Sequence, residues 1–275
     1  MKSDGHIHSP FCLHGTSDSF RKYIEKALEL GLEEISFTEH APLPEGFIDT
    51  TPTRDSSMGL RELEEYLLEV QALKKEYRDE LAINVGLEVD FIEGYEKQIE
   101  LFLNSYGPTL DDSILSVHFI KLQGNYYCLD YSVDLFEELI KLEGSVHKVY
   151  KKYYETVELG IQSDLGLYKP NRVGHLSLVH KFQKKFPVSA NFDDDVMRIL
   201  QQIKTKGMAL DYNGAGTQKE WCGEPYPSNQ YVKMALDMHI PLVYGSDAHQ
   251  AKDLGQGYSS LITSRIKKPS ETRRK

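Results

Sequence analysis

Short apolar runs alternate with longer amphipathic segments along almost the whole chain. The apolar runs cover residues 3–8, 34–40, 82–89, 113–118, 171–177, 208–213 and 241–247. Between them, apolar residues recur at spacings of three and four, which is typical of one buried helix face, over about 19–30, 59–80, 95–104, 132–159, 192–206 and 228–238. Seven strand–helix units in one chain predict parallel strands joined by crossover helices.

Seven parallel strands are many for a small open sheet, so the pattern favours an α/β fold of the closed or nearly closed, TIM-like barrel type, a (β/α)7 barrel. An open, doubly wound sheet is the alternative. The first strand–helix turn, however, lacks the glycine-rich phosphate loop that doubly wound folds often use. We expect a single domain over residues 1–265 and a frayed, basic and polar tail over residues 266–275.

Composition narrows the class of protein. The chain has 275 residues, of which 40% are hydrophobic and 27% charged, as expected of an ordinary soluble globular protein. No apolar run approaches the roughly 20 residues of a membrane span, and the start has no signal-peptide core. The three cysteines, Cys12, Cys128 and Cys222, are too few and too scattered for a disulfide framework, which indicates a reducing, cytoplasmic location.

The formal net charge of −10 disfavours binding to a nucleic-acid backbone, which requires a positive protein face. A small anionic substrate remains compatible with this charge, because bound metal ions can reverse its sign locally. The sequence therefore predicts a small-molecule partner, with no nucleic acid and no membrane, and it carries no signal for the oligomeric state.

Metal-capable side chains stand at or just past the ends of the predicted strands. They are His8, His40, Glu88, His118, His175 and Asp247. In a β/α barrel these strand ends share one rim, where active sites are built. His6 lies two residues before His8 on the same strand, so the two imidazoles leave on one face and can converge on one ion.

Two further histidines extend this set. His14 follows the first strand closely enough to fold back over the rim, and His249 comes two residues after Asp247. Imidazole and carboxylate ligands suit Zn²⁺, Fe²⁺ or Mn²⁺. The set contains seven histidines and two carboxylates, whereas one zinc ion needs only three or four protein ligands. It therefore predicts two or three ions with a bridging carboxylate.

Other interpretations of individual residues stay open. Taken singly, a histidine is more often a hydrogen-bonded, partly buried side chain than a metal ligand. His180 competes with His175, although only His175 ends a predicted strand. Cys12 is an alternative thiolate ligand. Asp4 either orients an imidazole from outside the ligand set or is simply a polar start to the first strand.

The ordered motifs resemble the polymerase and histidinol phosphatase (PHP) family. They are H-x-H with a third histidine six residues on, then "TEH", "GLEVD", "SVHF", "GHL" and "GSDAH". The resemblance covers nearly the whole chain and is greatest to stand-alone histidinol-phosphatases, which the segment "LDYNGAGTQKEWCGEPYPS" resembles. It implies a distorted seven-stranded barrel with three metal ions, and an enzyme of histidine biosynthesis that hydrolyses L-histidinol phosphate to L-histidinol and phosphate.

Carried over residue by residue, the resemblance implies three sets of ligands. One ion is held by His6, His8, Glu88 and Asp247, a second by Glu88 as a bridge with His118 and His175, and a third by His14, His40 and His249. Zinc is the expected metal, with iron or manganese as alternatives.

The expected chemistry is attack of a metal-bound hydroxide on the phosphorus of a monoester, so that no protein nucleophile is required. Asp247 and His249 are the candidates for protonating the leaving oxygen. The planar fork of arginine matches phosphate oxygens. Arg172 at the fifth strand and Arg54 in the loop after the second are the expected substrate-binding residues, although either can equally be a surface arginine.

Three alternative functions remain open. A phosphoesterase of the same family that acts on nucleotides or nucleic acid would use the same metal site. Metal-dependent amidohydrolases also begin with H-x-H and end with Asp, but they commonly bridge their ions with a carbamylated lysine, where this chain has Glu88. A metal-storage or metal-sensing protein would not need ligands spread over seven strand ends.

Overall fold

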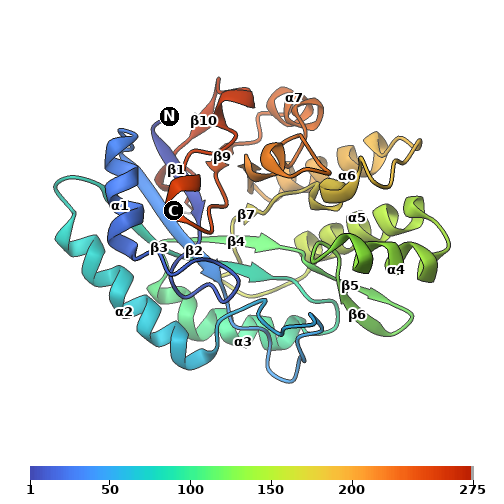
Figure 1. The fold of residues 1–275 in the computed structure, drawn as a ribbon, viewed down its shortest axis with the longest axis horizontal. Helices are drawn as coiled ribbons and strands as arrows, with labels where there is room; N and C mark the ends of the chain where they lie inside the picture. The colour runs from blue at the N-terminus through green and yellow to red at the C-terminus, as the bar shows by residue number, and fades with distance from the viewer. Residues whose placement is uncertain (274–275) are drawn as a thin grey trace.

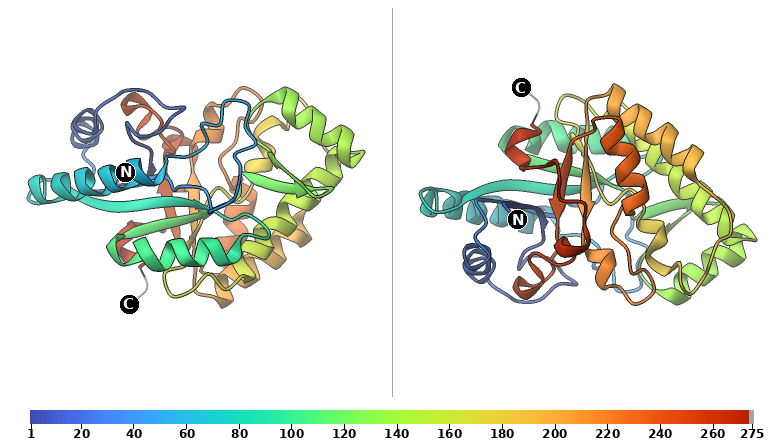
Figure 2. Two further views of the ribbon diagram at one scale, coloured as in Figure 1. Left: turned by 90° about the horizontal axis from the view of Figure 1, so that it is seen from below. Right: turned by 90° about the horizontal axis from the view of Figure 1, so that it is seen from above.

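The computed structural model describes residues 1–273, which form a curled parallel sheet with helices around its outside (Figures 1 and 2). The strand order is β1-β2-β3-β4-β7-β8-β9-β10. The strands are β1 Ser3–Ile7, β2 Glu34–His40, β3 Ala82–Asp90, β4 Asp112–Ser116, β7 Arg172–Val173, β8 Ala209–Asn213, β9 Leu242–Gly245 and β10 Ile266–Lys267. A separate antiparallel hairpin, β5 Phe119–Leu122 and β6 Asn125–Cys128, follows β4 in the chain.

Amphipathic helices connect most of these strands. They are α1 Phe20–Glu29, α2 Leu60–Glu76, α3 Glu96–Tyr106, α4 Val133–Glu143, α5 Val146–Gln162, α6 Asp193–Thr205 and α7 Asn229–Asp237. In α1, Phe20, Tyr23, Ile24 and Ala27 share the buried face, and the Ser19 side chain caps the first turn by accepting from Lys22 N. Among residues 1–273, no helix has both the length and the apolar composition needed to cross a membrane.

The curl of the sheet brings its first strand back to the segment that follows β9. The Asp247 N–H donates to His6 O at 2.8 Å, and the His8 N–H donates to Ala248 O at 3.0 Å. Seven strands, β1 to β4 and β7 to β9, thus form a nearly closed ring in sequence order. A doubly wound sheet would instead reverse its strand order at a switch point. The predicted TIM-like fold with a distorted barrel is confirmed.

Three local features differ from the sequence-based expectation. The strand expected over 171–177 is only Arg172–Val173, and the β5/β6 hairpin was not expected. The single helix expected over 132–159 is divided into α4 and α5. Gly144 ends α4 with a left-handed backbone, φ 82°, and the Ser145 side chain then caps α5 by accepting from Lys148 N.

Residues 266–273 pack against the sheet, which corrects the expectation of a frayed tail for this part of 266–275. The strand β10 pairs with the start of β9, and Pro269 is buried. The backbone N–H and the hydroxyl of Ser270 both donate to the carboxylate of Glu34, at 2.8 and 2.6 Å. Residues up to 273 therefore pack on the amino-terminal side of the sheet, while 274–275 lie outside the described residues.

Candidate metal centre

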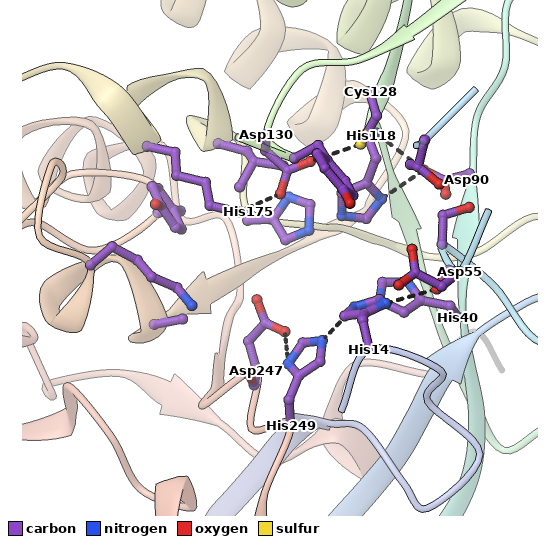
Figure 3. Close-up of a pocket in the computed structure, with 18 of the residues that line it drawn as sticks. His14, His40, Asp55, Asp90, His118, Cys128, Asp130, His175, Asp247 and His249 are labelled. Atoms are coloured by element: carbon purple, nitrogen blue, oxygen red, sulfur yellow. Dashed lines mark hydrogen bonds and ion pairs between the residues drawn. The ribbon is translucent and has the colours of Figure 1, made fainter. Parts of the chain in front are cut away.

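All nine predicted metal ligands come together at the carboxyl ends of the strands. His6 lies in β1, His8 directly after it and His14 in the next loop; His40 ends β2; Glu88 lies near the end of β3; His118 follows β4; His175 follows β7; Asp247 and His249 follow β9. Figure 3 shows the six that line a cavity, which are His14, His40, His118, His175, Asp247 and His249. His6, His8 and Glu88 are buried beneath them.

His6, His8, Glu88 and Asp247 form a first group of ligand atoms. Nε2 of His6 lies 3.3 Å from Glu88 Oε2 and 3.7 Å from Asp247 Oδ1. Nε2 of His8 lies 3.6 and 3.1 Å from the same two oxygens. Two ligands that each bond a zinc ion at about 2.1 Å in tetrahedral geometry lie about 3.4 Å apart, and the observed separations match that value.

Glu88 faces a second group of ligand atoms through its other oxygen. Its Oε1 lies 2.8 Å from Nε2 of His175 and 3.8 Å from Nε2 of His118. The hydroxyl of Ser116 donates to the same oxygen at 2.6 Å. Because the two oxygens of one carboxylate serve two groups, Glu88 is positioned to bridge two ions.

His14 and His249 face one another through ring nitrogens that both carry lone pairs. Nδ1 of His14 donates to the carbonyl of Asp55 at 2.9 Å, and Nδ1 of His249 donates to the carbonyl of Asp247 at 3.0 Å. In the neutral imidazole the other nitrogen is then an acceptor. The two Nε2 atoms lie only 3.1 Å apart, so a cation between them would satisfy both. The ring of His40 lies beside this pair, with its centroid 5.1 Å from that of His14.

Cys12 also lies near the third group. One potential ligand atom from each of Cys12, His8, His40 and His249 lies within 4.8 Å of the others. Burial raises the pKa of the Cys12 thiol well above its usual range. Its position makes Cys12 an alternative ligand, as the sequence suggested, whereas the raised pKa disfavours the thiolate form that binds a metal ion.

Three buried carboxylates orient the imidazoles through their second nitrogens. The contacts are His6 Nδ1 to Asp211 Oδ2 at 2.8 Å, His8 Nδ1 to Glu39 Oε1 at 3.1 Å and His118 Nδ1 to Asp90 Oδ1 at 2.8 Å. Such partners fix the ring and leave Nε2 free for a metal. We did not identify this role from the sequence. The signal available was an acidic residue within or directly after an apolar run, where packing alone does not require a charge.

Two alternatives that the sequence left open are resolved by these contacts. Asp4 accepts hydrogen bonds from the backbone N–H groups of Ser246, at 2.9 Å, and His6, at 3.4 Å, so it holds the backbone rather than an imidazole. Burial raises its pKa to about 6. His180 contacts Tyr154 Oη at 3.0 Å and Glu224 Oε1 at 2.7 Å. Of the two histidines, His175 is the one whose Nε2 lies beside the Glu88 carboxylate, so it stays the predicted ligand.

Several buried polar atoms of this cluster lack a hydrogen-bond partner. They are Nε2 of His6, both ring nitrogens of His40, Oε2 of Glu88 and Nδ1 of His175. A buried polar atom without a partner lowers the stability of the fold by about 1–3 kcal/mol. Several such atoms in one place are therefore expected where a bound ligand would contact them. Burial opposes ionisation of Glu88, but His6 and His118 hold the pKa of its carboxyl well below the usual range. The residues fit divalent metal ions.

A cavity of about 400 Å³ opens over the cluster. Besides the six predicted ligands of Figure 3, its lining includes Asp90, Asp130, Tyr131, Lys181 and Tyr226. Asp130 and Lys181 were missed by the sequence analysis. Lys181 lies in a short 3₁₀ helix, Leu178–Phe182, within the basic stretch "HKFQKK", and nothing in that stretch distinguishes it from a surface lysine.

The structure does not bring either predicted arginine into the cavity lining. Arg172 is 2% exposed, and its Nη2 donates to Gly5 O and to Asp112 Oδ2, both at 2.7 Å. Its Nη1 comes so close to Gly5 that a Cβ there would lie 2.4 Å away. Arg172 is thus a core residue facing the start of β4, which contradicts its predicted contact with substrate. Arg54 is exposed and adjoins Asp55, which does line the cavity.

Comparison with known proteins places the chain among proteins of one domain family. The model of the PHP domain matches residues 4–215. The histidinol-phosphatase of Bacillus subtilis (strain 168) is 50% identical over 264 residues, which cover 95% of this chain and 98% of that protein.

Two solved structures are similar over nearly the whole fold. A Listeria monocytogenes protein assigned as a histidinol phosphatase matches with a TM-score of 0.89 and 39% identity, covering 94% of this chain and 99% of that one. The histidinol phosphate phosphatase of Lactococcus lactis subsp. lactis matches with a TM-score of 0.72 and 22% identity, covering 97% and 95%. That structure is a complex with zinc, L-histidinol and phosphate.

Proposed function

Since the chain belongs to the PHP domain family, we infer from its relatives and its site that it is a histidinol-phosphatase, a phosphoric monoester hydrolase. It hydrolyses L-histidinol phosphate to L-histidinol and phosphate, a reaction of histidine biosynthesis. The Bacillus subtilis enzyme of that name shares half of its residues over nearly the full length of both chains. The single structural observation that carries the inference is the Glu88 carboxylate between two histidine groups at the base of a cavity.

The nine clustered residues hold two or three divalent metal ions in this proposal. His6, His8, Glu88 and Asp247 would bind one, Glu88, His118 and His175 a second, and His14, His40 and His249 a third. Zinc is the preferred ion because the ligands are imidazole nitrogens and carboxylate oxygens, and because the Lactococcus lactis structure contains zinc. Iron or manganese also suits such ligands. When bound, such ions lower the pKa of a water molecule and stabilise charge on phosphoryl oxygens.

The protein's own residues contribute orientation and proton transfer. Asp211, Glu39 and Asp90 hold the imidazoles so that Nε2 faces the ion positions. Asp247 stays one of the two predicted candidates for protonating the leaving oxygen. Burial opposes its ionisation, but His6 and His8 hold the pKa of its carboxyl well below the usual range, so Asp247 would first have to take up the proton of the attacking water before passing it to the leaving oxygen. Its Oδ2 accepts from Asn213 Nδ2 at 3.1 Å while its Oδ1 faces the first group. In His249, Nδ1 donates to the carbonyl of Asp247 and Nε2 faces His14 in the third group, so neither ring nitrogen is free to protonate the leaving oxygen.

Arg54 stays a prediction for a contact with the substrate from the mouth of the cavity. Its backbone adopts a left-handed conformation, φ 52°, on the loop that also provides Thr51, Asp55 and Ser56 to the cavity lining.

The function is tested by phosphate release from four substrates measured side by side with metal-loaded protein. They are L-histidinol phosphate, a nucleoside monophosphate, a phosphodiester and an amide. We expect selective hydrolysis of L-histidinol phosphate that is lost on chelation. Preference for the diester or the nucleotide would instead assign the protein to a phosphoesterase of another specificity, and hydrolysis of the amide alone would overturn the proposal.

A further inference from the structure

Lys181 is a cationic side chain held at one fixed place in the cavity lining. Its Nζ donates a hydrogen bond to Asp130 Oδ2 at 2.8 Å, and both side chains are largely shielded, at 23% and 16% exposure. They line the same cavity as His118 and His175 of the second ligand group. The only other lysine among the described lining residues, Lys219, is exposed.

The β5/β6 hairpin explains why Asp130 reaches this position. The hairpin leaves the sheet directly after His118 and returns beside it, where the Leu129 N–H donates to His118 O at 2.9 Å. Asp130 is the next residue, and Figure 3 shows it close to His118 and His175. The Cys128 thiol donates to its Oδ1 at 3.4 Å. Both oxygens of Asp130 are thus engaged, one by the thiol and one by Lys181.

The cavity lining is rich in carboxylates, so an anionic substrate would need the ammonium group of Lys181 as a positive partner. Five aspartates line the cavity, namely Asp55, Asp90, Asp130, Asp247 and Asp253. A phosphate dianion needs positive partners beyond the metal ions, because carboxylates repel it. Burial opposes ionisation of Asp130, but the neighbouring Lys181 and His118 hold its pKa well below the usual range. The pair is therefore fully charged at neutral pH, with the ammonium fixed by its partner.

An ammonium group has three N–H donors, and in the structure one N–H of Lys181 donates to Asp130. We propose that Lys181 donates to a non-bridging oxygen of the substrate's phosphate and that Asp130 acts through Lys181 as a positioning residue. This assignment rests on the proposed function for the identity of the substrate. A monoester has three non-bridging oxygens and a diester two, so an ammonium that takes the third favours a monoester.

The test compares Lys181→Met with Lys219→Met, which removes the other lysine of the lining. Inorganic phosphate and L-histidinol are each titrated into the metal-loaded protein by calorimetry, and metal content is measured in parallel. We expect Lys181→Met to weaken phosphate binding roughly 10- to 100-fold, as for a charge-assisted hydrogen bond. Binding of L-histidinol and metal content should stay within about threefold of the wild type, as should all values for Lys219→Met.

Unchanged phosphate affinity in Lys181→Met, or weaker binding of L-histidinol with phosphate unaffected, would overturn the assignment. Lys181→Arg, which keeps the charge, should restore most of the phosphate affinity, and thermal unfolding checks that each variant is folded. Failure of the wild type to hydrolyse L-histidinol phosphate would refute the proposed function alone. The phosphate titrations would still decide the role of Lys181.

The role of Asp130 is tested by combining substitutions. Asp130→Asn should weaken phosphate binding in the wild-type background, because Lys181 is no longer held in place. In the Lys181→Met background the same change should have little further effect, since residues that act as a unit are not additive. Full additivity of the two effects would show that Asp130 does not act through Lys181.

Discussion

Oε2 of Glu88 lies 3.3 Å from Nε2 of His6, and neither of these buried atoms has a hydrogen-bond partner. The other oxygen of the same carboxylate lies 2.8 Å from His175. If a carboxylate only stabilised the core, each of its oxygens would accept a hydrogen bond from a donor. Glu88 instead presents one oxygen to each of two imidazole groups, which is the arrangement that a bridging metal ligand requires.

Glu88→Gln should lower both metal content and turnover. An amide cannot offer two anionic oxygens, so we expect the loss of at least one ion per chain and a fall in kcat of more than about 100-fold. Loss of a residue that only orients a ligand already costs 10- to 100-fold. Metal analysis of purified protein and phosphate-release kinetics provide the measurement.

The control for Glu88→Gln is Asp253→Asn, which neutralises a carboxylate that lines the cavity outside the ligand groups. Its metal content should equal that of the wild type. Full metal content in Glu88→Gln would contradict the bridging role.

Asp211→Asn should weaken metal binding without removing any ligand. Asp211 is fully buried and lies 2.8 Å from Nδ1 of His6. Loss of this carboxylate leaves the ring less firmly oriented and less basic, and we expect metal affinity to fall about 10- to 100-fold. Competition with a chromogenic chelator measures the affinity. Asp237→Asn, at an exposed position, should behave as the wild type, and equal affinities for both variants would be evidence against an orienting role.

The positions of the ligands could be predicted from the sequence, whereas the residues that hold them could not. His40, Glu88 and Asp247 stand at ends of apolar runs, and the register of parallel strands brings such ends to one rim. Asp211 lies inside a run, where one sequence does not show which imidazole it meets. That contact depends on the curl that brings β1 beside β9 and so within reach of β8.

The sequence does not encode the direction in which a long side chain points. Arg172 lies in a strand, as predicted, but its guanidinium reaches back toward the start of β4. Lys181 reaches the cavity because a 3₁₀ helix follows β7, and Asp130 because a hairpin returns the chain to His118. Both depend on irregular segments that periodicity does not predict.

Arg172→Met should destabilise the fold while leaving substrate affinity intact. The change leaves Asp112, whose side chain is 9% exposed, with the Ser36 hydroxyl but without its cation, which costs up to about 3 kcal/mol. Adding Asp112→Asn should recover part of that loss. Urea unfolding measures the free energy, and KM for L-histidinol phosphate in the folded variant should stay within about threefold. A large rise in KM with unchanged stability would restore the role in substrate binding that the sequence suggested.

Asp49 should make a pH-dependent contribution to stability. Its carboxylate accepts hydrogen bonds from the N–H and hydroxyl groups of both Thr51 and Ser56, at 2.8–3.0 Å. Burial opposes ionisation of Asp49, but these bonds outweigh it and lower the pKa. A carboxyl whose pKa is lower in the folded state stabilises the protein above its ordinary pKa, near 3.9, and loses that contribution as the pH falls through the folded value.

Asp49→Asn should therefore lower the free energy of unfolding by about 0.5–1 kcal/mol at pH 7, because solvent weakens the hydrogen bonds of a partly exposed carboxylate. The difference from the wild type should shrink as the pH falls below about 4 and the wild-type carboxyl is protonated. Urea unfolding of chelator-treated protein at each pH is the measurement, since acid release of metal then makes no contribution. A difference that is the same at every pH would show that the charge of Asp49 is not involved.

The most direct test of metal-dependent phosphatase activity is to remove the metal and titrate it back. Bound metal is removed with a chelator, its absence is checked by mass spectrometry, and Zn²⁺ is returned stepwise while phosphate release from L-histidinol phosphate is followed. We predict no turnover without metal and a rise to a plateau at two or three equivalents per chain. Full turnover in the metal-free protein, or a plateau at one equivalent, would contradict a cluster bridged by Glu88.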